Sequence, residues 1–181
     1  MMSTALIVTD MLNDYRHEDA EPLMASVREV VPVLAELIDD ARKREMTVIY
    51  VNDNYREWTA GRPQLVERAL AGPEPALVEP IIPPDDTPFV VKARHSVFYG
   101  TPLEYMLRQF EIERIILAGQ VTEQCILYSA LDAYVRHFEV AVPRDAVAHI
   151  HGDLADAALR MMSMNMRADV CPARSLWASA A

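Results

Sequence analysis

The sequence predicts a three-layer α/β/α domain with a mainly parallel six-stranded sheet. Two observations lead to this fold class: short β-branched runs alternate with longer helical patterns, and the short runs are almost continuously apolar. Strands covered by helices on both faces show such runs, whereas half-exposed strands alternate between apolar and polar residues. The expected strands are residues 5–10, 47–52, 89–92, 114–119 and 139–143, with a weaker sixth at 168–171. Strand, helix, strand order implies right-handed crossovers between parallel neighbours.

Helices are expected between these strands, over residues 33–45, 101–110, 122 to about 138, and 153–166. In the first of them, apolar residues recur on one stripe, and Pro32 suits the first helical turn. Thr101, Pro102 and Glu104 have the spacing of a capping box with proline at the first helical position. Helix starts are therefore predicted near residues 32 and 101.

Residues 53–86 are the longest stretch without a clear helix or strand pattern. Prolines recur in it, at positions 63, 73, 75, 80, 83 and 84. In a compact domain, an irregular stretch of this length is typical of a pocket wall or a lid. The sequence contains neither an internal repeat nor a low-complexity segment, and 181 residues suit one hydrophobic core, so we expect a single domain over residues 1–181.

Charge and composition narrow the class of partner. The net charge of -10 argues against nucleic acid and anionic membranes, which are bound mainly through clustered Lys and Arg, and a small neutral or cationic molecule fits better. The first apolar run lacks a preceding basic segment and meets Asp10 too early for a signal peptide or a membrane span, so we expect a cytoplasmic protein. Cys125 and Cys171 show neither disulfide-framework nor zinc-ligand spacing, and no metal or other cofactor is expected.

Chemically reactive side chains follow three of the predicted strands. Asp10 ends the first strand, Lys92 ends the third, and Cys125 follows the fourth strand and Gly119 in the first turn of a helix. Ligands of open α/β sheets bind beyond the carboxyl ends of the strands, so these three groups can converge there. Taken singly, each has a plainer explanation: a buried core cysteine, a turn-forming aspartate and a solvated lysine. Their conjunction favours a catalytic site.

The three groups have complementary chemistry. The N-terminal end of a helix and the Lys92 ammonium both favour a thiolate at Cys125. Asp10 can accept the thiol proton as the sulfur attacks and then return it to a departing amine. Backbone N–H groups of the same helical turn can bind the oxyanion of a tetrahedral intermediate.

Four segments together form a specific pattern, in which Asp10, Lys92 and Cys125 are each contributed by a different one. They are TDMLNDY at 9–15, KARHSVFYGTPLE at 92–104, GQVTEQCILYSALDAYVR at 119–136 and VPRDAVAH at 142–149. In these segments the chain resembles the isochorismatase-like cysteine hydrolases over nearly its whole length. The resemblance implies that Asp10 is the general base, that Lys92 orients and polarises, and that Cys125 forms a thioester which water hydrolyses. It also implies a cis peptide between Gln120 and Val121, which directs the N–H groups of Val121 and Cys125 at the oxyanion.

Further residues are candidates for substrate binding. Asn13, Phe98 and Thr122 occupy motif positions that shape the pocket or its turn, as the resemblance implies. Aromatic residues on loops at the same edge of the sheet can contact substrate, or else serve packing or a subunit contact: Tyr15, Tyr55, Trp58 and Tyr99. Members of this superfamily commonly form dimers or larger assemblies, so a homo-oligomer is expected.

Two departures from related enzymes narrow the chemistry. Metal-dependent nicotinamidases carry a D-x-H motif after the second strand, whereas this chain has Asp53, Asn54 and Tyr55, which makes nicotinamide a less favoured substrate. His149 and His151 are better explained as neutral surface residues than as metal ligands. Isochorismatases that hydrolyse a vinyl ether generally lack the cysteine, so Cys125 favours cleavage of an amide-type C–N bond.

Two other functions stay open at the level of sequence. One is an ether hydrolase, in which Asp10 would protonate the substrate and Cys125 would be dispensable. The other is a non-catalytic member that uses the fold as a binding module. Loss of turnover in a Cys125→Ala protein separates the cysteine hydrolase from the first alternative.

Overall fold

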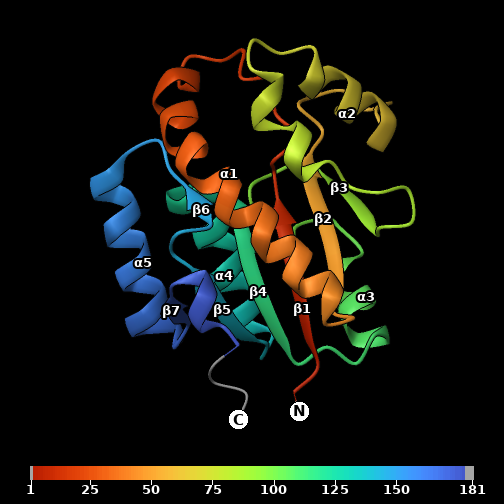
Figure 1. Ribbon diagram of the computed structural model, residues 1–181. Coiled ribbons are helices and arrows are strands. Elements are labelled where there is room, and N and C mark those ends of the chain that lie inside the picture. Colours follow the sequence, from red (N-terminus) through yellow and green to blue (C-terminus); the bar gives the residue numbers. More distant parts are fainter. Residues whose placement is uncertain (1, 178–181) are drawn as a thin grey trace.

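A parallel sheet forms the centre of the molecule in the computed structural model, which describes residues 2–177 (Figure 1). Its strand order is β3-β2-β1-β4-β5-β7, β6 pairs with β4, and every pairing is parallel. The strands are β1 (Thr4–Thr9), β2 (Thr47–Asp53), β3 (Phe89–Lys92), β4 (Arg114–Gln120), β5 (Glu139–Pro143), β6 (Val147–Ala148) and β7 (Asp169–Cys171). All six expected strands are present within one residue of their expected ends, and the fold class is confirmed. The two-residue β6 was missed because so short a strand leaves no pattern.

Helices cover both faces of the sheet, as the continuous apolar strands require. Helix α1 (Ala20–Lys43) crosses one face, while α3 (Leu103–Gln109), α4 (Leu127–Val135) and α5 (Gly152–Met166) cover the other (Figure 1). Side chains of β1 alternate between the two cores: Leu6 and Val8 pack on the α1 side, and Ala5 and Ile7 pack on the α4 side. No helix in residues 2–177 is both long enough and apolar enough to cross a membrane.

The predicted helix starts were wrong in two places. Helix α1 begins at Ala20, so Pro32 lies inside the helix and not in its first turn. Its buried stripe runs unbroken past the proline, which indicates that packing on the sheet outweighs the lost backbone hydrogen bond. Helix α3 begins at Leu103, and Glu104 pairs with Arg136 instead of closing a capping box. The Thr101 hydroxyl accepts a hydrogen bond from the Leu103 N–H at 3.3 Å, one residue earlier than a capping box requires.

The stretch 53–86 is more regular than the sequence indicated. It contains α2 (Arg62–Leu70) and two 3₁₀ turns, Pro75–Leu77 and Glu79–Ile81. Helix α2 buries only Leu65 and Ala69, too few apolar positions to show helical periodicity in the sequence. The helix lies beyond the upper edge of the sheet, the edge at which β1 and β2 end (Figure 1).

Gly119 allows the close approach of β1 and β4 at this edge. It lies opposite Thr9 in the β1–β4 ladder and has a φ of +113°. A Cβ atom at this position would lie 2.2 Å from the Thr9 carbonyl oxygen, so no other residue fits without displacing backbone. The ends of β1 and β4 are thereby held together immediately before Asp10 and Gln120.

Replacing this glycine tests how firmly the strand ends are held. Gly119→Ala should lower the free energy of unfolding by about 3 kcal/mol, because both the positive φ and the contact with Thr9 oppose a side chain. Denaturant unfolding followed by circular dichroism measures the change. Gly152→Ala is the matched control, since a Cβ there meets only ordinary contacts, and it should leave stability nearly unaltered. Equal stability of the two variants would contradict this account of the sheet edge.

Candidate active site

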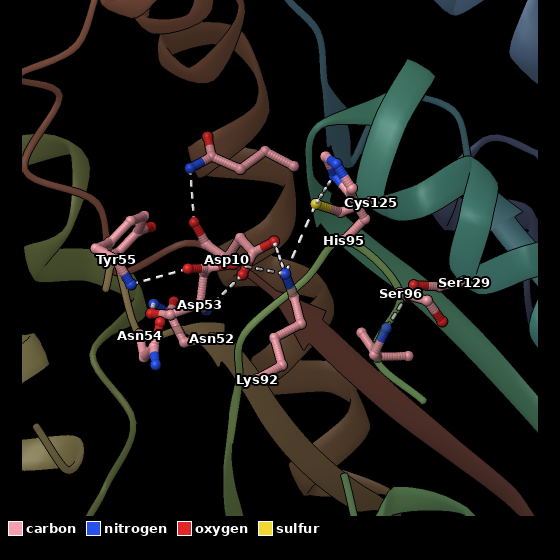
Figure 2. A network of polar contacts seen from close by, with 12 residues as sticks. Asp10, Asn52, Asp53, Asn54, Tyr55, Lys92, His95, Ser96, Cys125 and Ser129 are labelled. Atoms are coloured by element: carbon pink, nitrogen blue, oxygen red, sulfur yellow. Dashed lines mark hydrogen bonds and ion pairs between the residues drawn. The ribbon is translucent and has the colours of Figure 1, made fainter. Parts of the chain in front are cut away.

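Asp10, Lys92 and Cys125 meet at the carboxyl ends of the central strands, as expected (Figure 2). The Lys92 Nζ lies 2.9 Å from an Asp10 carboxylate oxygen and 3.7 Å from the Cys125 sulfur. All three residues are buried, with 7%, 2% and 9% of their surface exposed, respectively. An acid, an ammonium and a thiol thus share one small, poorly hydrated site.

The Asp10 backbone and side chain are both fixed by hydrogen bonds. The residue has a φ of 56°, a left-handed conformation that aspartate tolerates better than most residues. Its N–H donates to the Val51 carbonyl at 2.9 Å, and its carbonyl accepts from the Gln120 side chain at 2.6 Å. One carboxylate oxygen accepts the Asp53 N–H at 2.7 Å, which leaves the other for Lys92.

Lys92 lies between two carboxylates. It pairs with Asp53 in the β2–β3 ladder, and its Nζ is 3.5 Å from an Asp53 carboxylate oxygen. Burial by itself lowers the pKa of Lys92, but the charge of Asp10, its hydrogen bond with the ammonium and the charge of Asp53 outweigh burial and raise the pKa above its ordinary value. The ammonium therefore keeps its proton throughout the neutral range.

The segment that carries Cys125 differs from an ordinary helix start. A cis peptide joins Gln120 to Val121, as the resemblance implied. The chain then forms a π-helical turn over Thr122–Ile126 that leads into α4, and the Ile126 N–H donates to the Val121 carbonyl at 3.1 Å. The Val121 backbone lies near enough to the Cys125 sulfur to favour its charged form. The wider turn thus brings the sulfur and the Val121 backbone together.

The expectation of a stabilised thiolate was wrong. Burial of the sulfur and the negative charge of Asp10 raise the pKa of the Cys125 thiol, and they outweigh the opposing effects of Lys92 and the Val121 backbone. Burial likewise raises the pKa of Asp10, although Lys92 opposes this shift. The resting sulfur is therefore a protonated thiol beside a carboxylate whose affinity for a proton is raised.

A family model of the isochorismatase domain matches residues 4–175. The chain belongs to the isochorismatase family. The family protein YaaI of Bacillus subtilis is 30% identical over 166 residues, 92% of each chain. The maleamate amidohydrolase of Pseudomonas putida is 27% identical over 163 residues, 86% of this chain and 76% of that protein. The solved N-carbamoylsarcosine amidase of Thermoplasma acidophilum has a TM-score of 0.73 and 25% identity, over 97% of this chain and 99% of that one.

These comparisons confirm the resemblance found in the sequence. The family match spans nearly the whole chain, and relatives that cleave amides align over most of it. The protein is accordingly an isochorismatase-family hydrolase, and proteins similar to it act on C–N bonds other than peptide bonds.

Two of the candidates for substrate binding, Tyr15 and Phe98, are buried inside this isochorismatase-family protein. Phe98 is buried and stacks on Phe138 at a ring distance of 6.0 Å. Tyr15 is also buried, and its hydroxyl donates to the Gln120 side chain at 3.4 Å. Both belong to the hydrophobic cores that flank the sheet. Their burial left no signal in the sequence, because both residues lie in loops, where no regular periodicity marks the buried positions.

The other candidates divide between polar side chains that bond the backbone and aromatic side chains that are exposed or half-buried. The Asn13 side chain accepts the Tyr15 N–H at 2.7 Å and so holds a turn, whereas the Thr122 hydroxyl donates to the Ala148 carbonyl at 2.9 Å and ties the π-helical turn to β6. Trp58 and Tyr99 are strongly exposed. Tyr55 is half-buried beside the charges of Asp10 and Asp53, and burial with these charges raises its pKa well above the ordinary value.

Metal-ligand geometry is absent from the described part of the chain: no three His, Cys, Asp or Glu side chains there are grouped to hold an ion. Asp53 pairs with Lys92, and Tyr55 stands where a D-x-H motif has its histidine. The His149 Nδ1 lies 3.1 Å from the Ser26 hydroxyl. These residues do not fit the metal centre of a nicotinamidase.

Three residues that contact the site were not predicted from the sequence as part of it: Asp53, Gln120 and His95. Asp53 ends β2 as Asp10 follows β1, so the rule that located Asp10 could also have found it. Gln120 contacts the Asp10 carbonyl only because β1 and β4 are neighbours, which no local pattern reveals. His95 lies 3.9 Å from the Cys125 sulfur through its Nδ1, in a loop whose path the sequence did not indicate.

The raised pKa of Cys125 can be measured by thiolate absorbance in a Cys171→Ser background. The thiol should titrate above pH 9, the ordinary value, and Asp10→Asn should move the titration downward because it removes a negative charge beside the sulfur. Asp40→Asn, which alters an exposed carboxylate on α1, should leave the titration unmoved. A thiol that titrates well below pH 9 in the unaltered site would contradict this description.

Proposed function

We propose that the protein hydrolyses an amide-type C–N bond of a small molecule through a thioester on Cys125. The observation that carries the proposal is the contact of one ammonium with both a carboxylate, at 2.9 Å, and the thiol sulfur, at 3.7 Å. Such a constellation contains a nucleophile, a base and a fixed positive charge within reach of one another.

Acylation begins with transfer of the thiol proton. Because the pKa of Cys125 is raised, the sulfur needs a base, and the neighbouring Asp10 carboxylate is placed to take the proton. The sulfur then attacks the substrate carbonyl, and the N–H groups of Val121 and Cys125 stabilise the oxyanion. Asp10 returns the proton to the nitrogen as the C–N bond breaks, so an amine or ammonia leaves and the acyl group stays on sulfur.

Lys92 supports this step without exchanging a proton. Its raised pKa keeps it charged, so it holds the Asp10 carboxylate in one orientation and stabilises the sulfur as negative charge develops there. Asp53 shares the ammonium and supplies the N–H that fixes the second Asp10 oxygen. The burial of Asp10, Lys92 and Cys125 strengthens the electrostatic interactions among them.

The relatives suggest the class of substrate. Maleamate and N-carbamoylsarcosine, acted on by two similar proteins, are small molecules with a terminal amide or carbamoyl group. We expect a small amide, carbamoyl or ureido compound here, with Tyr55, Trp58 and Tyr99 as substrate contacts at the rim. Tyr55 in place of a histidine makes nicotinamide a poorer fit. We further propose that the protein works as a homo-oligomer.

Removal of the sulfur is the direct test of this function. Cys125→Ala should reduce ammonia release from maleamate or N-carbamoylsarcosine by about 1,000-fold or more, because no thioester can form. Cys171→Ala, which alters the half-buried cysteine of β7, should retain full activity. Nicotinamide should be turned over more slowly than either compound. Ammonia release retained by Cys125→Ala would exclude the thioester. If neither protein releases ammonia from these compounds and both hydrolyse a vinyl ether, an ether hydrolase in which Asp10 acts alone as the acid is favoured instead.

A further inference from the structure

A histidine contacts the Cys125 sulfur from the side opposite to Lys92. The His95 Nδ1 lies 3.9 Å from the sulfur, whereas the Lys92 Nζ approaches it at 3.7 Å from within the sheet (Figure 2). Unlike Asp10, Lys92 and Cys125, His95 is exposed. The sulfur therefore lies between a buried ion pair and an imidazole that reaches solvent.

The position of this imidazole is held by the structure on both sides of the loop. The loop leaves β3 at Lys92, and the Val97 N–H then donates to the Ser129 hydroxyl of α4 at 3.0 Å. The His95 ring also packs edge-to-face on Tyr128, with ring centres 5.4 Å apart. Strand β3 and helix α4 together thus keep His95 over the sulfur, although the residue lies on the surface.

The second half of the reaction begins with a water molecule that enters from solvent and must lose a proton. Asp10 is buried, and its two oxygens already accept the Asp53 N–H and the Lys92 ammonium, whereas His95 is exposed. Lys92 remains charged and cannot accept a proton. The water that hydrolyses a thioester must enter from outside, where His95 stands beside the sulfur.

We propose that His95 is a catalytic residue for hydrolysis of the thioester, an inference that rests on the proposed function. Its unprotonated Nδ1 accepts a proton from the entering water as the water oxygen bonds to the acyl carbon. The C–S bond then breaks, the carboxylic acid leaves, and the proton on Nδ1 passes to the sulfur to restore the thiol. Acylation is left to Asp10, so the two half-reactions use bases on opposite sides of one sulfur.

The two half-reactions can be separated with p-nitrophenyl acetate, whose nitrophenolate is released on acylation. The unaltered protein should give a burst equal to the enzyme concentration, followed by a steady rate set by thioester hydrolysis. His95→Asn keeps a polar atom near the place of Nδ1 but cannot carry a proton. We expect it to leave the burst rate within about twofold and to lower the steady rate by about 100-fold, with acetylated Cys125 accumulating in the intact mass.

Controls distinguish this role from a structural one. His137→Asn alters another exposed histidine, at a positive φ that asparagine tolerates, and should change neither phase. Cys125→Ala gives the background of acetylation elsewhere. If His95→Asn slows both phases equally or neither, the inference is overturned while the thioester mechanism stands. If the unaltered protein never acetylates Cys125, the proposed function itself fails.

Discussion

The site depends on the buried ion pair between Asp10 and Lys92. Taking both charges out of water is costly, and only their 2.9 Å contact, the Asp53 carboxylate and the Asp53 N–H compensate for it. Loss of Lys92 would leave the buried Asp10 carboxylate without a charge partner, and an unpaired buried charge typically costs about 3–5 kcal/mol. The pair is possible because parallel strands β1, β2 and β3 end at one edge and place the three residues side by side.

The same burial determines how the thiol behaves. A cysteine at a helix start is ordinarily expected to ionise easily, but here burial and the Asp10 charge raise the pKa of Cys125. The sulfur is therefore protected in the resting state and becomes nucleophilic only as Asp10 takes its proton. His95 has a related role on the solvent side, because hydrolysis of the thioester requires a group that accepts a proton from water, and His95 lies beside the sulfur there.

The sequence allowed the sheet and the three central residues to be predicted for the same reason. Strands buried on both faces are continuous apolar runs, so their ends are visible, and Asp10 and Lys92 stand at two of those ends. The burial of Tyr15 and Phe98 could not be predicted, because it depends on contacts with Gln120 and Phe138 far along the chain. Helix α1 was placed too short since Pro32 reads as a helix start, and only its packing on the sheet overrides that signal.

The decisive measurement is to trap the acyl group on the Cys125 sulfur during turnover. The protein is incubated with maleamate, quenched in acid during turnover, and its mass and peptides are measured. We expect the protein to gain the mass of the acyl group on the peptide that contains Cys125, and Cys125→Ala to gain none. Turnover of maleamate with no acyl group on Cys125 under rapid quench, or with the group on another residue, would contradict it.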